Sequence, residues 1–167
     1  VLVDSILKAF FSNDFEMVDN VQKTYDLTND FAQLLRFAFN GKKEFEHVKL
    51  IPGRPLNVML PTKVYSIEEA FEVCGKPAAF EHKYDGFRML IHGTDKGIVL
   101  FTRKLENVTA QFPDVAEAIK KHITGKSFIL DSEAVGFNPQ TKKYKPFQEI
   151  SQRIKRKYEI EKLSSSL

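Results

Sequence analysis

Residues 78–103 read AAFEHKYDGFRMLIHGTDKGIVLFTR, and this stretch decides the fold. It contains three short apolar runs, at 78–84, 87–93 and 97–103, separated by an Asp-Gly pair at 85–86 and by the glycine-bounded segment 93–97. Asp-Gly between apolar runs is a strong signal for a two-residue β-hairpin turn, and a glycine-containing loop of a few more residues is typical of a longer hairpin. The stretch therefore predicts three successive antiparallel strands.

Downstream of these strands the pattern alternates between helix and strand. Residues 113–122 predict a helix, with Val115, Ala118 and Ile119 on one stripe. Residues 127–137 predict another strand, and residues 147–163 predict a second helix. This order favours an α+β domain with an antiparallel sheet over a doubly wound parallel sheet.

Upstream, residues 1–40 predict helices, because apolar residues recur there at helical spacing. Asp30 and Gly41 flank the last of these helices as its start and stop signals. Prolines at positions 52, 55 and 61 exclude a continuous helix over residues 49–62, and Ser66 begins a short helix in the manner of a capping box. We therefore expect three parts: a short helical segment at 1–48, a linker at 49–62, and an α+β domain at 63–167.

Composition limits the function only loosely. The chain of 167 residues is 43% hydrophobic and 28% charged, which is ordinary for a globular protein, and its net charge of +3 is too small to identify a nucleic-acid partner. Cys74 is the sole cysteine, which excludes an internal disulfide and a cysteine-based zinc site and favours a reducing, intracellular setting. We expect its side chain to be a buried small apolar group. No apolar run approaches the roughly 18 residues of a membrane span.

The predicted Asp-Gly turn places charged residues across from each other. In a two-residue hairpin Lys83 lies directly opposite Arg88, and Glu81 shares the face of Lys83. Like charges directly opposite each other destabilise a sheet, so the pair makes more sense with an anion such as a phosphate between them. A nearby cation also disfavours the charged form of a lysine, which helps its amine act as a nucleophile. From local physics alone, a hairpin whose charges merely face solvent is the favoured interpretation.

Several segments favour a functional site over a solvent-exposed hairpin, because they resemble one protein family. Residues 83–88, KYDGFR, resemble the KxDGxR motif of the covalent nucleotidyltransferases: ATP-dependent DNA ligases, RNA ligases and mRNA capping enzymes. Residues 101–109 resemble the family's second block, with Thr102 in place of the usual serine, and residues 128–135 resemble its Asp-Gly-Glu block, with Ser132 in place of glycine. Residues 111–115 resemble the segment that follows the second block, and residues 146–150 and 153–157 look most like the archaeal and eukaryotic-type DNA ligases. Residues 52–55 and 59–60 look like the junction before the adenylation domain of those ligases. The resemblance covers roughly residues 20–167.

The resemblance implies adenylation chemistry centred on Lys83. Its amine would attack the α-phosphate of ATP and release pyrophosphate, and AMP would pass to the 5′-phosphate at a DNA nick before the 3′-hydroxyl seals the strand. Glu81 would contact the adenine, and Arg88 and Arg103 would lie near the ribose and phosphates, where a guanidinium gives directed hydrogen bonds. Glu133 would accept from a ribose hydroxyl or help to place Mg²⁺, which makes it the candidate metal ligand.

The same resemblance gives each part of the chain an expected identity. Residues 1–48 would be the last helices of a DNA-binding domain, residues 49–62 the junction, and residues 63–167 the first part of an antiparallel-sheet nucleotidyltransferase (ATP-grasp-like ligase adenylation) domain. We expect a monomer without membrane association that acts on nicked double-stranded DNA, with a sliding clamp as a candidate partner. The implied location is intracellular, in the cytoplasm of an archaeon or in a eukaryotic nucleus. Because later blocks of the family's pocket do not occur in this sequence, we expect the fragment alone to be inactive or weakly active.

Two alternatives and two minor expectations complete the interpretation. An RNA ligase or an mRNA-capping-type nucleotidyltransferase would share the lysine motif, whereas a non-catalytic DNA-binding fragment would keep the fold without the chemistry. Asp131 shares the face of Glu133 and is expected to be solvated. Residues 142–162 carry eight lysines or arginines against three glutamates, which is compatible with contact to a DNA backbone or with the solvated face of an amphipathic helix.

Overall fold

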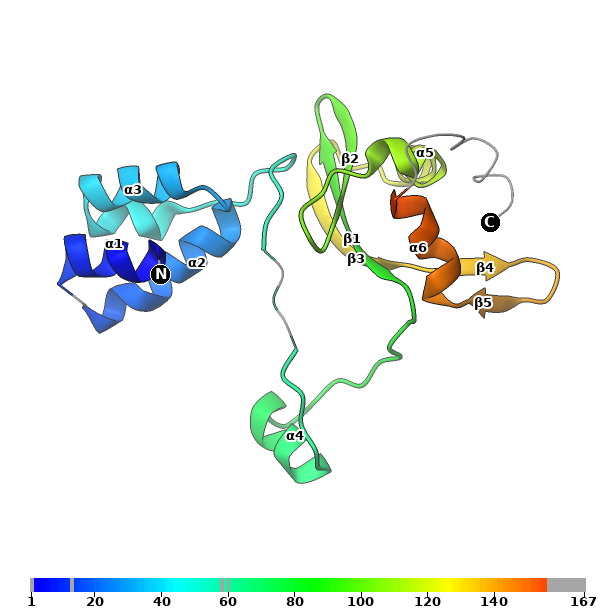
Figure 1. The fold of residues 1–167 in the computed structure, drawn as a ribbon, viewed down its shortest axis with the longest axis horizontal. Helices are drawn as coiled ribbons and strands as arrows, with labels where there is room; N and C mark the ends of the chain where they lie inside the picture. Colours follow the sequence, from blue (N-terminus) through cyan, green and yellow to red (C-terminus); the bar gives the residue numbers. More distant parts are fainter. Residues whose placement is uncertain (1, 13, 58, 60, 156–167) are drawn as a thin grey trace.

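The computed structural model describes residues 2–12, 14–57, 59 and 61–155, and these residues form two separate hydrophobic cores (Figure 1). One core lies within a helical unit and the other beneath a small antiparallel sheet. In the described part of the chain, no helix combines the length and the apolar character that crossing a bilayer requires.

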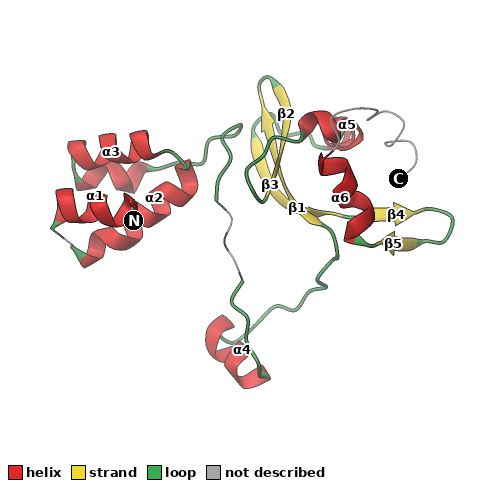
Figure 2. Cartoon of the chain, viewed as in Figure 1, coloured by secondary structure: helices red, strands yellow, loops and turns green. Residues whose placement is uncertain are grey.

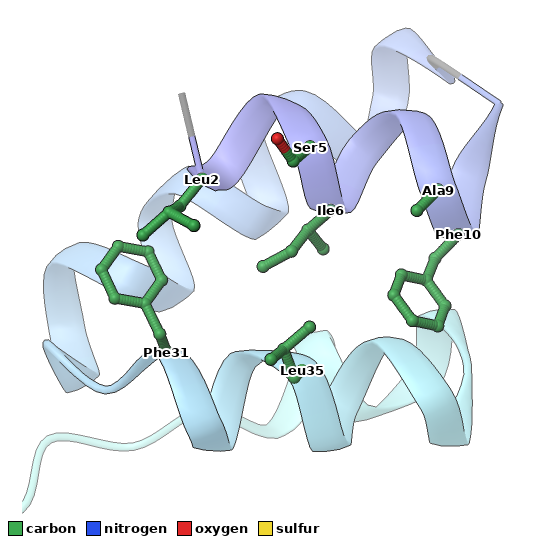
Figure 3. Close-up of a pocket in the computed structure, with 7 residues that line it drawn as sticks. All are labelled: Leu2, Ser5, Ile6, Ala9, Phe10, Phe31 and Leu35. Atoms are coloured by element: carbon green, nitrogen blue, oxygen red, sulfur yellow. The ribbon is translucent and has the colours of Figure 1, made fainter.

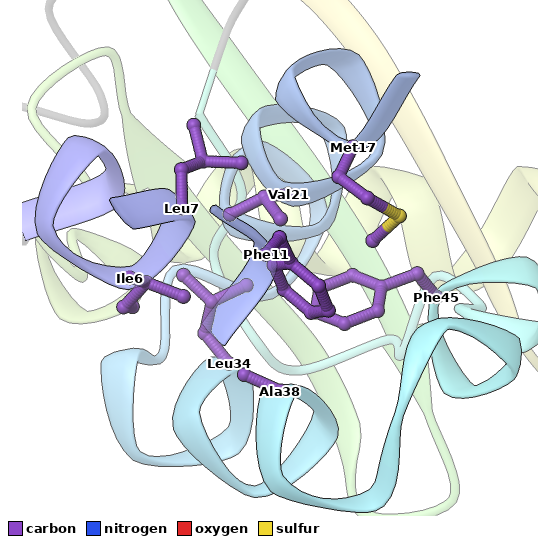
Figure 4. Packing of buried hydrophobic residues seen from close by; sticks show 8 residues of the cluster. All are labelled: Ile6, Leu7, Phe11, Met17, Val21, Leu34, Ala38 and Phe45. Atoms are coloured by element: carbon purple, nitrogen blue, oxygen red, sulfur yellow. The ribbon is translucent and has the colours of Figure 1, made fainter. Parts of the chain in front are cut away.

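The helical unit consists of α1 (Leu2–Phe11), α2 (Phe15–Thr28), α3 (Phe31–Asn40) and the short 3-10 helix η1 (Lys42–His47). The carboxylate of Asp30 caps α3 by accepting a hydrogen bond from the backbone N–H of Gln33, and Gly41 ends it at a φ of 106°. The helices predicted over residues 1–40 are therefore confirmed. Figure 4 shows the buried side chains between them, which are Ile6, Leu7, Phe11, Met17, Val21, Leu34, Ala38 and Phe45.

The fourth helix, α4 (Ile67–Cys74), stands apart from both cores in Figure 1. It begins as predicted, because the Ser66 hydroxyl accepts from the N–H of Glu69 while the Glu69 carboxylate accepts from the N–H of Tyr65. The expectation of a buried Cys74 is wrong: its side chain is exposed, since α4 buries none of its residues among those described.

The sheet contains β1 (Phe87–Thr94), β2 (Gly97–Thr102) and β3 (Phe128–Ala134) in the order β2-β1-β3, with both pairs antiparallel. Every second side chain of β1, namely Phe87, Met89 and Ile91, points to one face of the sheet. The helices α5 (Pro113–His122) and α6 (Phe147–Lys155) cover that face (Figure 2). The mixed helix and antiparallel-sheet class is therefore confirmed. The buried residues of this second core are Phe87, Met89, Ile91, Leu100, Val108, Phe112 and Ile150.

The predicted strand at 78–84 and the two-residue hairpin at Asp85-Gly86 are wrong. Residues 78–84 form neither strand nor helix, and Asp85-Gly86 is a bend that leads into β1. The physical reason is that β2 and β3 occupy both edges of β1, which leaves no edge for a strand at 78–84. Lys83 therefore has no cross-strand partner, and the residue opposite Arg88 on β3 is Glu133.

The predicted strand at 127–137 is present but divided. It breaks at Val135 into β3 and β4 (Gly136–Asn138), and β4 pairs with β5 (Lys143–Lys145) in a separate hairpin. The helix predicted at 113–122 matches α5, which follows the short 3-10 helix η2 (Thr109–Gln111). The helix predicted at 147–163 is confirmed as far as Lys155, and its remainder lies outside the described residues.

Arg153 fastens α6 to α5. Its guanidinium forms a two-bonded ion pair with Asp114, donates to the carbonyl of Gln111 at 3.2 Å, and lies 4.5 Å from the centre of the Phe112 ring. Only 5% of Arg153 is exposed. This member of the basic stretch at 142–162 therefore holds the fold together and is not presented to a DNA backbone.

Residues 51–57, which we call the strap, connect the helical unit to the sheet. At one end the N–H of Gly53 donates to Nδ1 of His92 on β1 at 2.9 Å. Arg54 bonds to the side chain of Gln33 on α3, and the N–H of Asn57 donates to the carbonyl of Asp26 on α2 at 2.9 Å. The strap is thus bonded to both parts of the chain within five residues.

We expect acidification to destabilise the docking of the strap. His92 is fully buried, and burial lowers its pKa from the ordinary value of 6.5. Because Nδ1 accepts the hydrogen bond from Gly53, the ring is neutral, with its proton on Nε2, which has no hydrogen-bond partner among the described residues. The folded pKa lies below the unfolded one, so the unfolded chain binds the proton first as the pH falls. Stability is therefore full above about pH 6.5 and declines below it.

Urea unfolding at about pH 7.5 and about pH 5.5 measures this effect. The control is His92→Gln, whose amide oxygen can accept from Gly53 but does not titrate. The wild-type chain should lose more unfolding free energy between the two pH values than the variant does. Equal losses of unfolding free energy in the two proteins would show that protonation of His92 does not cause the pH dependence.

Candidate active site

Lys83 is exposed, and the two residues that follow it contact β5 and the start of α6. The ring of Tyr84 meets the ring of Tyr144 edge to face, with 5.7 Å between their centres. The carboxylate of Asp85 accepts a hydrogen bond, at 3.4 Å, from the N–H of Phe147, the first residue of α6. A carboxylate at this place satisfies one of the free N–H groups of the helix and interacts favourably with its dipole. The Lys83 loop is thus anchored on its C-terminal side.

Gly86 is held against β3 so closely that no side chain fits. A Cβ added there would lie 2.2 Å from the carbonyl oxygen of Ala134 and 2.7 Å from Cγ1 of Val135. The motif's glycine is therefore required for the close approach of two backbones at the start of β1, and not for a hairpin turn.

Arg88 projects from β1 on the face opposite the second core. Its Nε donates to Asp131 Oδ1 at 2.8 Å, its Nη2 bonds the other Asp131 oxygen, and its Nη1 donates to the carbonyl of Met59 at 3.1 Å. Asp131 is exposed, as expected, and in addition it orients the guanidinium of Arg88. The two side chains are 27% and 51% exposed, so the pair contributes little to stability, and its effect is to fix the orientation of the guanidinium.

Of the remaining expected site residues, Glu133 and Arg103 lie at the same end of the sheet as Arg88. Glu133 lies opposite Arg88 in the β1–β3 register and is exposed. Arg103 is exposed and directly follows the last paired residue of β2, which is opposite Met89. Glu81 is exposed in the irregular segment before β1. Among the described residues, no hydrogen bond or ion pair joins Lys83 or Glu81 to the charged groups of the sheet.

The described residues contain no group of three or more side chains placed to hold a metal ion. Glu133 and Asp131 nonetheless lie two residues apart on one face of β3, and only Asp131 is engaged, through Arg88. Magnesium commonly takes one or two protein carboxylates and completes its shell with water and phosphate oxygens. The carboxylates present therefore fit a magnesium ion that a polyphosphate helps to hold.

Sequence reasoning missed Asp131 and Tyr144. Alternation along β3 did place Asp131 beside Glu133, but its pairing with Arg88 follows from the β1–β3 register, which no local pattern contains. Tyr144 comes close to Tyr84 through the β4–β5 hairpin, about 60 residues along the chain. An exposed tyrosine between lysines gave no signal of such a contact.

A cavity of about 240 Å³ lies elsewhere, between α1 and α3 of the helical unit (Figure 3). Its lining is apolar except for one serine and carries no charged group, so it offers nothing to hold a phosphate. The residues that line it are Leu2, Ser5, Ile6, Ala9, Phe10, Phe31 and Leu35.

Comparison with known proteins decides the family. The family model described as ATP dependent DNA ligase domain matches residues 58–167, which include every expected site residue. The chain belongs to the ATP-dependent DNA ligase family. This membership favours a DNA ligase over the RNA ligase, capping-enzyme and non-catalytic alternatives.

Curated relatives agree with this ligase assignment. The chain is 43% identical over 148 residues to a DNA ligase of Nanoarchaeum equitans, covering 88% of this chain and 26% of the relative. It is 34% identical over 167 residues to a DNA ligase of Thermoplasma volcanium, covering 99% and 28%, and 36% identical over 162 residues to one of Nitrosopumilus maritimus, covering 96% and 27%. The ligase chain thus spans between a quarter and a third of the length of these relatives.

Among solved structures, a mycobacterial DNA ligase D complexed with ATP and MES matches with 27% identity and a TM-score of 0.31. The match covers 35% of this chain and 19% of that one. The overlap is too small to bear on the fold, which rests on the elements described above.

Proposed function

We propose that Lys83 is the residue that becomes adenylylated in an ATP-dependent DNA ligase. Its amine attacks the α-phosphate of ATP, so that a nitrogen–phosphorus bond forms while the bond to the β-phosphate breaks and pyrophosphate leaves. AMP then passes to the 5′-phosphate of a nick, and the 3′-hydroxyl displaces AMP to seal the strand. The observation that carries the proposal is the anchoring of the Lys83 loop at the end of the sheet from which Arg88 and Glu133 project.

Arg88 is suited to bind the nucleotide because its cation is already oriented. Asp131 holds two of its nitrogens, while Nη1 is bonded only to the carbonyl of Met59. A phosphate oxygen can compete with that neutral carbonyl, because a guanidinium binds an anionic oxygen more strongly than a neutral one. A donor fixed before the substrate arrives also costs less reorganisation during the reaction.

The other expected roles are proposals on the same basis. Glu81 contacts the adenine, Arg103 binds near the ribose and phosphates, and Glu133 accepts from a ribose hydroxyl or places Mg²⁺. When bound, Mg²⁺ neutralises charge on the phosphates and polarises the bond that breaks. Exposure of all three side chains leaves them accessible to a nucleotide.

The finer assignments of the whole protein are also proposals. We propose that residues 63–167 are the first part of an ATP-grasp-like nucleotidyltransferase domain, that residues 1–48 are the last helices of a DNA-binding domain, and that residues 49–62 join the two. The substrate is nicked duplex DNA, the protein is an intracellular monomer of an archaeal cytoplasm or a eukaryotic nucleus, and a sliding clamp is a candidate partner. The exposed Lys142 and Lys143 at the tip of the β4–β5 hairpin are accessible to duplex phosphates.

Labelled nucleotides test this function. Full-length protein incubated with Mg²⁺ and ATP carrying label in its α-phosphate should acquire covalent label, whereas label in the γ-phosphate should leave with pyrophosphate. A chase with nicked duplex DNA should release the label as AMP and yield sealed strands. Residues 1–167 alone should label weakly or not at all, because they span only part of the ligase length. A preference for GTP would indicate a capping-type enzyme, and unlabelled protein that still binds nicked DNA would indicate a non-catalytic role.

A further inference from the structure

The two residues that follow Lys83 contact β5 and the start of α6. The ring of Tyr84 meets that of Tyr144 on β5, and the carboxylate of Asp85 accepts a hydrogen bond from the N–H of Phe147, the first residue of α6. The segment from Tyr144 to Phe147 therefore lies against the loop that carries Lys83.

This segment rests on well-packed structure. Ile150 of α6 is 4% exposed within the second core, and Arg153 of α6 is held by Asp114 of α5. On the other side, the ring of Phe137 on β4 lies 5.9 Å from that of Tyr144 and supports it across the hairpin. The Tyr144 ring, which is 62% exposed, therefore ties the irregular segment to the β4–β5 hairpin, and the N–H of Phe147 ties it to α6.

The Lys83 loop depends on these contacts because it is not part of a hydrogen-bonded sheet. Residues 78–84 pair with no strand in the described part of the chain, so no sheet fixes the backbone of Lys83 from its N-terminal side. Each residue that is left unfixed samples many conformations, and few of them aim a lysine amine at a phosphorus atom.

We propose that Tyr144 is a positioning residue for Lys83, acting through the ring of Tyr84. The inference rests on the proposed function, because it assumes that Lys83 is the nucleophile. Tyr144 touches neither of the reacting groups. It restricts the residue next to Lys83, so that the amine spends more time in a reactive orientation. The aromatic ring is the active part, and the hydroxyl is dispensable because the contact joins the two rings.

A double-mutant cycle in the full-length protein tests the proposal. The rate of covalent AMP attachment is measured in a single turnover at saturating ATP for wild type, Tyr84→Ala, Tyr144→Ala and the double variant. Each single variant should slow the rate about 3- to 10-fold, the range for loss of an aromatic pair, and the double variant should be no slower than the slower single variant. The KM for ATP should change less than about twofold, because neither ring binds the nucleotide.

The controls separate positioning from damage to the fold. Tyr144→Phe should keep the wild-type rate, and Tyr144→Leu, which keeps apolar bulk without an aromatic edge, should be slow. Phe137→Ala removes a neighbouring ring from the same hairpin without touching Tyr84, and its rate should be closer to that of wild type than the rate of Tyr144→Ala. A merely structural defect would lower the fraction of protein that becomes labelled instead of the rate constant.

The outcomes are distinguishable from failure of the proposed function. If wild-type protein takes up no label at Lys83, the function itself is wrong. If it does, but the single effects multiply in the double variant, or Tyr144→Phe is as slow as Tyr144→Ala, then Tyr144 does not position Lys83.

Discussion

Replacing Lys83 with alanine abolishes covalent labelling of the full-length protein by ATP. We expect a loss of at least about a thousandfold, because the variant lacks the proposed nucleophilic amine, and removal of a nucleophile is among the most costly changes in an active site. Lys83 is exposed and makes no hydrogen bond or ion pair among the described residues, so the folded state should be unaffected. Label retained on the protein after denaturation, followed by peptide mapping, measures the effect.

The matched control is Lys96→Ala. Lys96 is an exposed lysine in the turn between β1 and β2, at the other end of the strand that follows Lys83. It should label like wild type. Binding of nicked duplex DNA should persist in both variants, since neither removes more than one positive charge. Covalent label that survives in the Lys83 variant, on any residue, would rule Lys83 out as the nucleophile.

Replacing Gly86 with alanine should both destabilise the sheet and slow adenylylation. The added methyl group would lie 2.2 Å from the carbonyl oxygen of Ala134, a backbone atom fixed by the pairing of Phe87 with Ala134, so β1 and β3 must move apart. Forcing an extra carbon into a packed site costs about 1–3 kcal/mol, and we expect the upper part of that range because the obstacle is backbone. The same displacement moves Arg88 relative to Glu133.

Urea unfolding and the single-turnover labelling rate measure the two consequences. Gly125→Ala is the control, because its nearest contact would be a carbon of the Phe128 ring at 3.2 Å, and a ring can shift where a backbone cannot. It should cost less than about 1 kcal/mol. Equal unfolding free energies for the two variants would show that β3 yields at Ala134, and that the glycine of the motif is not required for packing.

The parts of the fold that follow from local chemistry could be predicted. Asp30 and Gly41 delimit α3 as their capping preferences indicate, and α5 begins at Pro113, where a missing N–H costs nothing. The hairpin between β1 and β2 follows from the glycine-bounded loop between two apolar runs. Each of these signals lies within a few residues of the element it specifies.

The Asp-Gly signal failed because a stronger, non-local demand decided the pairing of β1. Its apolar side chains must cover the second core, and β3, which begins 34 residues after the end of β1, pairs with β1 and packs Phe128 and Ala134 against that core. An isolated hairpin at Asp85-Gly86 would have competed for that edge. Turn propensity is worth little against the burial of a whole strand.

The candidate site also contains residues that the sequence could predict and partners that it could not. Motif resemblance predicted Arg88, Arg103 and Glu133 as nucleotide-binding residues, and these roles stay predictions. The register of β1 with its two neighbours places the three residues at one end of the sheet. The partners that orient these groups were out of reach, since Asp131 meets Arg88 across two strands and the carbonyl of Met59 belongs to a segment without regular structure. Such partners depend on tertiary geometry and carry no pattern of their own.

The strap sets a length limit on movement between the two cores. Its hydrogen bonds to His92 and to Asp26 start from Gly53 and Asn57, four residues apart, and four residues of fully extended chain reach at most about 14 Å. Any movement of the helices away from the sheet beyond that distance must first break the hydrogen bond from Gly53 or the one from Asn57. The hydrogen bond from Gly53 to His92 would be the easier of the two to release on acidification, because a proton on Nδ1 removes its acceptor.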